Sequence, residues 1–376
     1  MRVVSIVGAR PQFVKLAVVA RAFASFADIT HEIIHTGQHY DDEMSGSFFR
    51  DLAIPAPAYN LEVGSSSHAN QTAEIMRRLE PILREVNPEW VILYGDTNST
   101  IASAVTASKM SCKLAHVEAG LRSFNRAMPE EINRVVADHL SHLLFCPTET
   151  AMANLVREGL GEQAVLCGDV MYDAVCDYVR DLEGTDPSSE LPWAERSYAL
   201  ATIHRAENTD DRERLKSLLA SLQQVSREVC PVVLAVHPRT KKAMEELRWD
   251  ASALQLVPPL AYKQMLLCQK HARMILTDSG GIQKEAYFLK VPCITLRNET
   301  EWVETLENDC NILVNPSHAD EMREAVQRTL KAGPWGSHYG NADAGKIIAR
   351  AIAATRVDPA LKTHQGSAAP LASFAN

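Results

Sequence analysis

The chain has 376 residues, of which 46% are hydrophobic and 23% charged, and its formal net charge is −9. This size and balance predict two domains, each able to bury its own core. The negative charge and the lack of a Lys/Arg-rich run argue against nucleic acid as a partner, because binding a phosphate backbone needs a concentrated basic face. No apolar run approaches the roughly 20 residues of a membrane span, so we expect no membrane association.

The eight cysteines are scattered along the chain and form no C-x-x-C pair. Most lie in apolar segments such as Leu144-Phe145-Cys146-Pro147, which predicts buried, reduced thiols and neither a disulfide framework nor a zinc site. The first residues run into an apolar strand without a charged leader, so we expect a cytoplasmic protein. No H-E-x-x-H or similar metal-ligand spacing occurs, and we expect neither a metal nor another cofactor.

Short apolar runs in the first half predict strands, and apolar residues at helical spacing predict helices between them. The expected strands lie at 3–7, 32–36, 90–94, 113–117, 143–146 and 165–167, with helices after residue 11, at about 70–85 and near 100–109. Strands that are apolar throughout and alternate with helices are typical of a parallel sheet covered on both faces.

Residues 185–192 are rich in turn-forming residues and predict a linker, after which the alternation restarts. The second half has expected strands at 198–203, 232–236, 254–257, 274–276 and 293–296, an amphipathic helix at 214–229, a helix near 344–355 and a tail after Val357. We therefore predict an α/β fold with two Rossmann-like domains facing each other across a cleft. Residues 1–175 form the first domain, 190–343 the second, and 344–376 a closing helix and tail.

One stretch of the second half carries the clearest binding signal. An apolar strand leads into a sharp Ser279-Gly280-Gly281 turn and then a helix from about Ile282. Glycines let the backbone approach a ligand closely, and the unpaired N–H groups of a helix start favour an anion such as phosphate. Glu285 lies one turn further on, within reach of a sugar hydroxyl. The alternative is an ordinary βα turn capped by Ser279, since the spacing matches neither a Walker loop nor a G-x-G-x-x-G motif.

Polar residues collect where the predicted strands end, which is where such sheets bind ligands. They are Arg10, Asp96, Glu118, His204, His237, Ser279, Glu285 and Arg297, and Glu130 and Arg134 lie at an expected helix start that has Pro129 in its first turn. The cations suit a diphosphate, whereas carboxylates and a histidine suit removal and return of a proton.

Each of these residues also has a purely structural interpretation. Asp96 could cap the following helix, and Glu118 could pair with Arg122 four residues later. Glu130 could interact with the helix dipole, and His204 and His237 could be hydrogen-bonded loop residues. Their convergence on one predicted cleft is the argument for function.

Several blocks resemble, in the same order, those of the non-hydrolysing UDP-N-acetylglucosamine 2-epimerases, from Gly8 to about Ile348. They are GARP at 8–11, GDTNST at 95–100, HVEAGLR at 116–122, PEEINR at 129–134, PTE at 147–149, DSGG at 278–281, KEA at 284–286 and TLRNETE at 295–301. The resemblance implies a GT-B-like fold, a homodimer and conversion of UDP-GlcNAc to UDP-ManNAc. A base removes the C2 proton while UDP leaves C1, and UDP adds back to the resulting 2-acetamidoglucal after reprotonation on the other face.

The resemblance also implies roles for individual residues. Asp96, Glu118 and Glu130 are the acid/base candidates, and His204 is the catalytic histidine near the diphosphate. The expected UDP-sugar site contains Arg10, Ser279 and Gly280 at the phosphates and Glu285 at the ribose, together with Lys15, Arg134, His237, Gly281 and Arg297. The C2 proton is barely acidic, so C–O cleavage should run ahead of proton removal, and stabilisation of the leaving group should be a large effect. A closed cleft would keep water from the intermediate.

Three departures from the better-known members indicate which branch of the family the chain resembles. The chain reads GARPQF at 8–13 where those members read G-T-R-P-E, and it has Tyr40-Asp41-Asp42 where members with a regulatory UDP-GlcNAc site carry Arg and Gln. The loop between Glu118 and Glu130 is about two residues shorter. These variants are similar to the branch that includes 2-epimerases of UDP-2,3-diacetamido-2,3-dideoxyglucuronic acid, which is the alternative substrate.

Functions from other classes remain as alternatives. A GT-B glycosyltransferase would share the fold and the nucleotide-binding helix, but it would not need Asp96, Glu118 and Glu130 together. A catalytically inactive nucleotide-sugar binder and a hydrolase that releases N-acetylmannosamine are the further alternatives.

Overall fold

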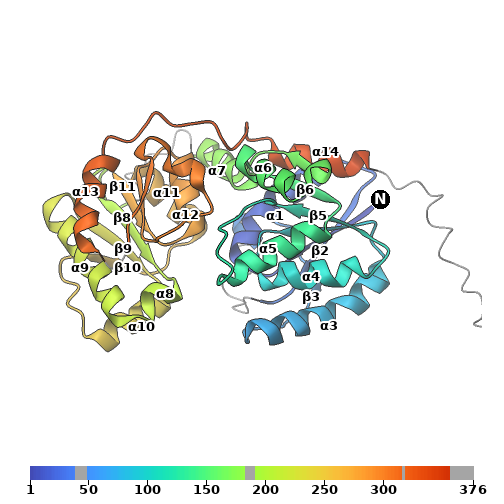
Figure 1. Cartoon of the computed structure of the whole chain (residues 1–376), viewed down its shortest axis with the longest axis horizontal. Coiled ribbons are helices and arrows are strands. Elements are labelled where there is room, and N and C mark those ends of the chain that lie inside the picture. Colours follow the sequence, from blue (N-terminus) through green and yellow to red (C-terminus); the bar gives the residue numbers. More distant parts are fainter. Residues whose placement is uncertain (39–48, 183–190, 316–317, 356–376) are drawn as a thin grey trace, which may run out of the picture.

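The computed structural model describes residues 1–38, 49–182, 191–315 and 318–355. The expected tail after Val357 and most of the expected linker at 185–192 lie outside these residues. The described chain forms two α/β lobes (Figure 1). Here the first lobe means residues 1–182 with 344–355, and the second lobe means residues 191–343.

The first lobe is built on a seven-stranded sheet, and every strand pair in it is parallel. Its order is β3-β2-β1-β4-β5-β6-β7, so the strand order reverses between β1 and β4, the place where such sheets bind ligands. The strands are β1 (Arg2–Val7), β2 (Thr30–His35), β3 (Tyr59–Asn60), β4 (Trp90–Tyr94), β5 (Lys113–Val117), β6 (Leu143–Cys146) and β7 (Ala164–Leu166).

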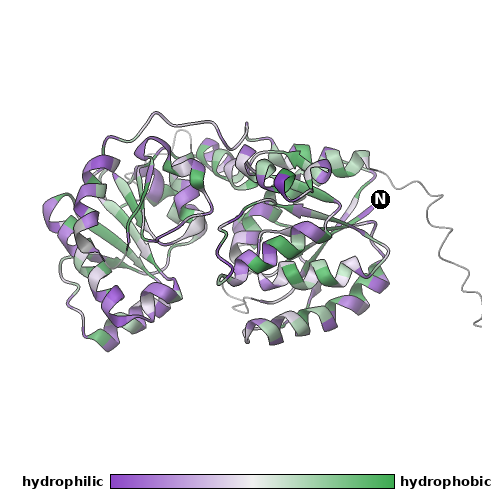
Figure 2. Ribbon diagram, in the orientation of Figure 1, coloured by the Kyte–Doolittle hydropathy of each residue, from purple (hydrophilic) through white to green (hydrophobic). Residues whose placement is uncertain are grey.

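Helices cover both faces of this sheet, which explains why its central strands are largely apolar. In β4, Trp90, Ile92 and Tyr94 pack into one core, whereas Val91 and Leu93 pack into another on the opposite face. The helices of the first lobe are α1 (Arg10–Phe23), α3 (His68–Val86), α4 (Asn98–Ser108), α5 (Pro129–Leu140), α6 (Glu149–Arg157), α7 (Val170–Asp181) and the short η1 (Gly161–Gln163). Figure 2 shows the hydrophobic residues gathered in the strands and the inward helix faces.

The second lobe has a six-stranded parallel sheet in the order β10-β9-β8-β11-β12-β13. Its strands are β8 (Ala199–Ile203), β9 (Val232–Val236), β10 (Gln255–Val257), β11 (Met274–Thr277), β12 (Cys293–Thr295) and β13 (Asn311–Leu313). Its helices are α8 (Ala206–Thr209), α9 (Arg212–Glu228), α10 (Pro238–Leu247), α11 (Tyr262–His271), α12 (Gly280–Phe288), η3 (Val303–Asp309) and α13 (Ala319–Thr329). The α/β fold with two Rossmann-like domains is thus confirmed.

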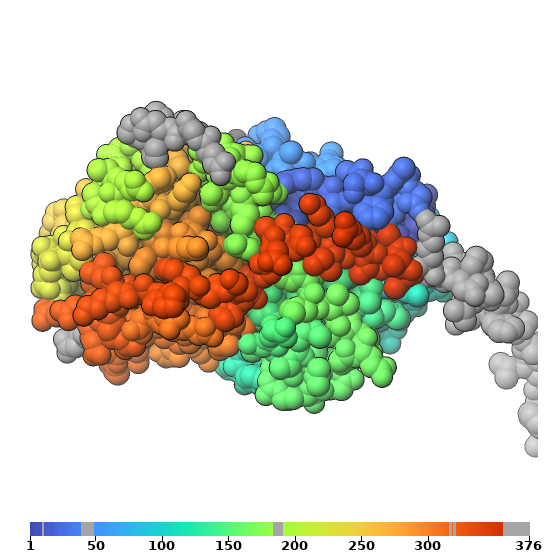
Figure 3. Space-filling model, turned by 90° about the horizontal axis from the view of Figure 1, so that it is seen from above, coloured from blue at the N-terminus to red at the C-terminus, as the bar shows by residue number. Residues whose placement is uncertain are grey.

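The last described helix, α14 (Ala344–Ala354), returns to the first lobe and packs against α1 and α7. Ile348 and Ile352 join the same core as Val18 of α1. A Cβ at Gly345 would lie only 2.6 Å from Val18 Cγ1, so the helices approach as closely as a glycine allows. Seen from above in Figure 3, the red segment runs from the second lobe across to the first. None of the described helices has the length and apolar character to span a membrane.

Candidate active site

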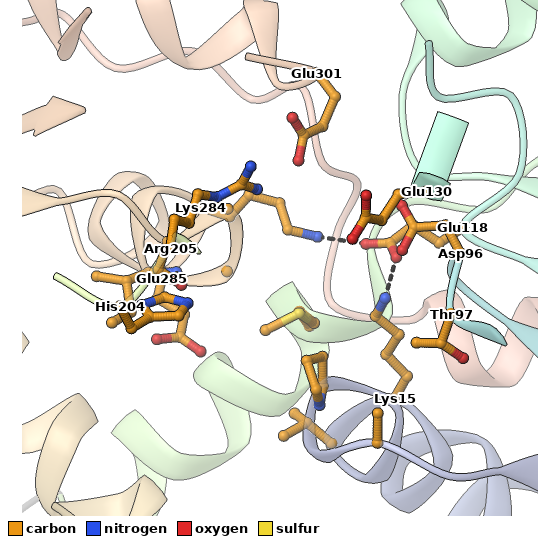
Figure 4. Close-up of a pocket in the computed structure, with 18 of the residues that line it drawn as sticks. Lys15, Asp96, Thr97, Glu118, Glu130, His204, Arg205, Lys284, Glu285 and Glu301 are labelled. Carbon is orange, nitrogen blue, oxygen red and sulfur yellow. Dashed lines mark hydrogen bonds and ion pairs between the residues drawn. The ribbon is translucent and has the colours of Figure 1, made fainter. Parts of the chain in front are cut away.

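A cavity of about 650 Å³ is lined by residues of both lobes. The close-up in Figure 4 shows the carboxylates of the first lobe on one side and His204, Lys284 and Glu285 of the second lobe on the other. The cavity collects most of the expected site: Lys15, Asp96, Glu118, Glu130, Arg134, His204, His237, Ser279, Gly280, Gly281 and Glu285. Arg297 does not line it, and the side chain of Arg10 lies outside what the structure describes.

Glu118 follows β5 and is held by a lysine on each carboxylate oxygen. Its φ of +74° is in the left-handed region, and its N–H donates to Phe145 O at 3.1 Å. Lys15 Nζ contacts Oε2, and Lys284 Nζ lies 2.7 Å from Oε1. Burial raises the pKa of Glu118, but Lys15 and Lys284 together outweigh burial and lower it to about 2. Glu118 is therefore ionised at neutral pH.

The alternative pairing of Glu118 with Arg122 is wrong. Arg122 donates to Asp138 Oδ2 at 2.7 Å and forms a two-point ion pair with Glu158, also at 2.7 Å. The i,i+4 rule applies within a helix, and Glu118 lies in a turn that directs its side chain away from Arg122.

Asp96 and Glu130 are the other carboxylates of the first lobe in the cavity. Arg134 Nη2 contacts Asp96 Oδ2, and Arg134 Nη1 donates to Glu131 at 2.9 Å. The side chain of Thr97 caps α4, so the interpretation of Asp96 as a helix cap is wrong. Glu130 lies in the first turn of α5, as expected, and is exposed. It can interact with the helix dipole and also face the cavity.

A buried histidine supports this wall from behind. His116 Nδ1 lies 2.7 Å from Asp138 Oδ1, and its Nε2 lies 2.7 Å from Gly95 O. Both ring nitrogens thus face oxygen atoms of the surrounding chain. The contact with Gly95 O holds the backbone directly before Asp96.

His204 is oriented by Asp278, which is fully buried. Asp278 accepts hydrogen bonds from the N–H groups of His204 and Arg205 and from Asn208 Nδ2, all at 3.0–3.1 Å. Its Oδ1 is 3.1 Å from His204 Nδ1. Burial raises the pKa of Asp278, but these partners outweigh burial and hold the pKa below its usual value. With Nδ1 occupied, the Nε2 of the half-exposed His204 is left for a ligand in the cavity.

The start of α12 combines both interpretations of the Ser279-Gly280-Gly281 turn. Ser279 Oγ accepts from Ile282 N at 3.4 Å and caps the helix, which begins at Gly280 and so slightly earlier than expected. Gly280 and Gly281 form part of the cavity wall, where first-turn N–H groups suit an anion. A Cβ at Gly280 would lie 2.9 Å from Glu301 Oε1, so the turn lies close to the end of the Glu301 side chain.

Glu285 lies one turn into α12 and is buried. Its Oε2 accepts from Gln269 Nε2 at 2.7 Å. Burial raises the pKa of Glu285 to about 7, so its protonation changes near neutral pH. Among the described residues, no group of three or more histidine, cysteine, aspartate or glutamate side chains is placed to hold a metal ion.

This geometry agrees with comparisons to known proteins. The sequence pattern of the family described as UDP-N-acetylglucosamine 2-epimerase matches residues 21–353. The chain belongs to this family. A UDP-N-acetylglucosamine 2-epimerase homolog of Methanococcus maripaludis is 49% identical over 336 residues, which are 87% of this chain and 92% of the relative. The UDP-2,3-diacetamido-2,3-dideoxy-D-glucuronate 2-epimerase of Pseudomonas aeruginosa is 41% identical over 359 residues, which are 94% of this chain and 99% of the relative.

A solved structure extends the likeness of this 2-epimerase family member to three dimensions. The crystal structure of Methanocaldococcus jannaschii UDP-GlcNAc 2-epimerase in complex with UDP-GlcNAc and UDP superposes with a TM-score of 0.88 at 39% identity. The alignment covers 94% of this chain and 100% of that one. The arrangement of the lobes is therefore that of a nucleotide-sugar 2-epimerase.

Sequence reasoning did not single out Lys284 and Glu301, which line this cavity, or Asp278, which orients His204. Glu301 lines the cavity and pairs with Arg297, whose Nη1 lies 3.2 Å from Glu301 Oε2. Arg297 thus contacts a residue of the cavity wall without lining the cavity itself. All three lie in blocks that carried the family resemblance, but only the three-dimensional contacts show what they touch.

Proposed function

We propose that this protein is a non-hydrolysing UDP-sugar 2-epimerase that inverts C2 of a UDP-2-acetamido sugar, converting UDP-GlcNAc to UDP-ManNAc. One observation carries the proposal: Asp96, Glu118 and Glu130 share a single cavity with His204 and the N-terminus of α12. The carboxylates can transfer a proton at C2, and the groups opposite them can stabilise the anionic leaving group at C1. The reaction needs both functions at these adjacent carbons.

In the first half of the reaction, the N–H groups of α12 and His204 hold the diphosphate while the C1–O bond breaks. The C2–H bond then breaks, its electron pair forms the C1=C2 double bond, and the proton passes to a carboxylate. A base with a low pKa suffices, because positive charge developing at C1 makes the C2 proton acidic. Glu118, which is ionised and directed into the cavity, fits this task.

In the second half, a proton returns to C2 from the opposite face and the UDP oxygen adds to C1. The intermediate must stay between the lobes meanwhile, since water would otherwise trap it. Asp96 and Glu130 supply further carboxylates for this step. The Asn125 side chain donates to Glu299 across the lobes at 2.8 Å and helps to keep the cavity closed.

The name of the Pseudomonas relative favours a second substrate, UDP-2,3-diacetamido-2,3-dideoxyglucuronic acid, on which the same chemistry would act. Proton NMR in D2O, with each UDP-sugar in its own tube and no acceptor, separates the possibilities. Conversion with deuterium at C2 in the UDP-GlcNAc tube supports the first substrate, and turnover only in the other tube supports the second.

The same experiment contains the outcomes that contradict epimerisation. A glycosyltransferase would leave C2 undeuterated when no acceptor is present. A hydrolase would release UDP without forming a UDP-sugar product. Either result would overturn the proposed function.

The proposal includes a homodimer in the cytoplasm. The dimer follows from the family resemblance, and light scattering coupled to gel filtration tests it. All eight cysteines are free, and most are buried, which fits a reducing compartment. A mass of one chain in solution would contradict the dimer.

A further inference from the structure

One lysine of the second lobe reaches across the cavity to the first. Lys284 lies on α12, and its side chain is 1% exposed. Its ammonium donates to Glu118 Oε1 and to Asp169 Oδ2, each at 2.7 Å, and lies 3.6 Å from the centroid of the Trp302 ring. Figure 4 shows its side chain extended toward Glu118. Lys284 thus connects the helix expected to hold the diphosphate with the group expected to take the proton.

Its second partner, Asp169, lies where the chain crosses between the lobes. Asp169 caps α7, since its Oδ1 accepts from Met171 N at 2.7 Å. Its own N–H donates to Tyr339 O at 3.0 Å, in the segment that returns from the second lobe to α14. A Cβ at Gly168 would lie 2.8 Å from that same oxygen, so the two segments are in close contact. Lys284 therefore lies between this crossing and Glu118.

The charges around Glu118 come from both lobes. Lys15 of the first lobe and Lys284 of the second balance the two buried carboxylates, Glu118 and Asp169. Asp96, which is paired with Arg134, and Glu130 face the same space (Figure 4). Of the two lysines that contact Glu118, Lys284 is thus in place only when the lobes are together.

We propose that Lys284 is a positioning residue, which holds Glu118 ionised and oriented for proton abstraction only when α12 is docked against the first lobe. The inference rests on the proposed function, in which Glu118 takes the C2 proton. Ser279 caps α12, and Gly280, Lys284 and Glu285 all belong to this nine-residue helix. Movement of the nucleotide-binding helix therefore moves the partner of the base, and capture of the diphosphate is coupled to readiness for proton transfer.

The test compares Lys284→Met with wild type and with Lys290→Met, a matched change at an exposed site near the end of α12. C2 deuteration is followed from pH 5 to pH 9, and UDP binding is measured by calorimetry. We expect kcat of Lys284→Met to fall about 100-fold, because the carboxylate is no longer held in place. We expect its acidic limb of kcat/KM to move upward by about 1–3 pH units, since burial then outweighs Lys15. UDP affinity should stay within about threefold, because the N–H groups of α12 are retained.

Lys284→Met leaves a buried negative charge unbalanced, which favours misfolding. A second variant avoids this imbalance. Asp169→Asn combined with Lys284→Met removes one carboxylate with the lysine, so the remaining Glu118–Lys15 pair is neutral. This double variant should show the same shift of the acidic limb, and Lys284→Arg should restore most of the wild-type profile. Lys290→Met should behave as wild type.

Two results would overturn the inference. One is an acidic limb that stays in place in both Lys284→Met and the double variant. The other is a loss of UDP affinity as large as the loss of kcat/KM, which would make Lys284 a ligand-binding residue. Absence of C2 exchange in the wild type would refute the proposed function and this inference with it, whereas exchange in the wild type with an unshifted limb refutes the inference alone.

Discussion

The two walls of the cavity are built on different principles. On the first-lobe wall, side-chain carboxylates are held by basic side chains, as Glu118 is by Lys15 and Asp96 by Arg134. On the second-lobe wall, the main chain at the start of α12 and a histidine oriented by Asp278 present donors to the cavity. The first wall suits proton transfer and the second suits anion binding. Changes to the first wall should therefore alter chemistry more than binding.

The substitution expected to show this difference between the walls most strongly is Glu118→Gln. An amide cannot take the C2 proton, so C2 deuteration should fall by about 1,000-fold. UDP affinity should stay nearly unchanged, because the groups that we propose to hold the diphosphate lie on the other wall. The same change at Glu245, on the exposed face of α10, serves as the control. Full activity of Glu118→Gln would remove Glu118 from the mechanism.

The next effect concerns the chemistry of the second wall. His204→Asn removes the side chain that we propose to face the leaving diphosphate, and it should lower kcat by about 100-fold. His139→Asn, at a half-exposed position of α5 away from the cavity, should leave kcat unchanged. The rate of UDP-ManNAc formation measures both. A kcat of His204→Asn within a factor of two of wild type would mean that α12 alone stabilises the leaving group.

A smaller effect is expected at Glu285, where one substitution should change protein stability and UDP binding in opposite directions. Its pKa of about 7 in the folded protein lies above the ordinary value of 4.5. Between these pH values the folded state keeps a proton that the unfolded chain has lost, so this group makes the free energy of unfolding fall as pH rises. Glu285→Gln should therefore raise stability at pH 8, by at most about 3 kcal/mol, and leave it nearly unchanged at pH 4.

The same variant should weaken UDP binding at pH 8 by about 1–2 kcal/mol, because the proposed charged acceptor for a ribose hydroxyl is lost. At pH 6, where the wild-type carboxyl is largely protonated, the difference should shrink. Thermal melts and calorimetry at these pH values measure the two effects. Unchanged UDP affinity at pH 8 would leave Glu285 with a structural role only.

The sequence predicted most of the fold because both sheets are covered on both faces, which makes strands such as β4 continuous apolar runs. Two edge strands escaped prediction. The two residues of β3 and the three of β13 are too few to show a run, and each strand contains an asparagine. Edge strands pair on one side only, so their sequence is less constrained than that of the central strands.

The candidate site was predictable as far as it depends on strand ends, which place Asp96, Glu118 and His204 on one cavity. The partners of these residues were not predictable. Lys284 contacts Glu118 across 166 positions of the chain, and no local spacing rule connects them. The alternative pairing of Glu118 with Arg122 is wrong for a related reason, because residues four apart share a face in a helix but not in a turn.

The packing of α14 has a consequence for how the protein is made. Ile348 and Ile352 complete the core around Val18, yet they follow the whole second lobe in the chain. While a ribosome is still producing the second sheet, the apolar face of α1 that α14 covers is open to solvent. A chain that stops at Tyr339 would leave that face uncovered permanently. The lobe that is synthesised first is thus the one that is finished last.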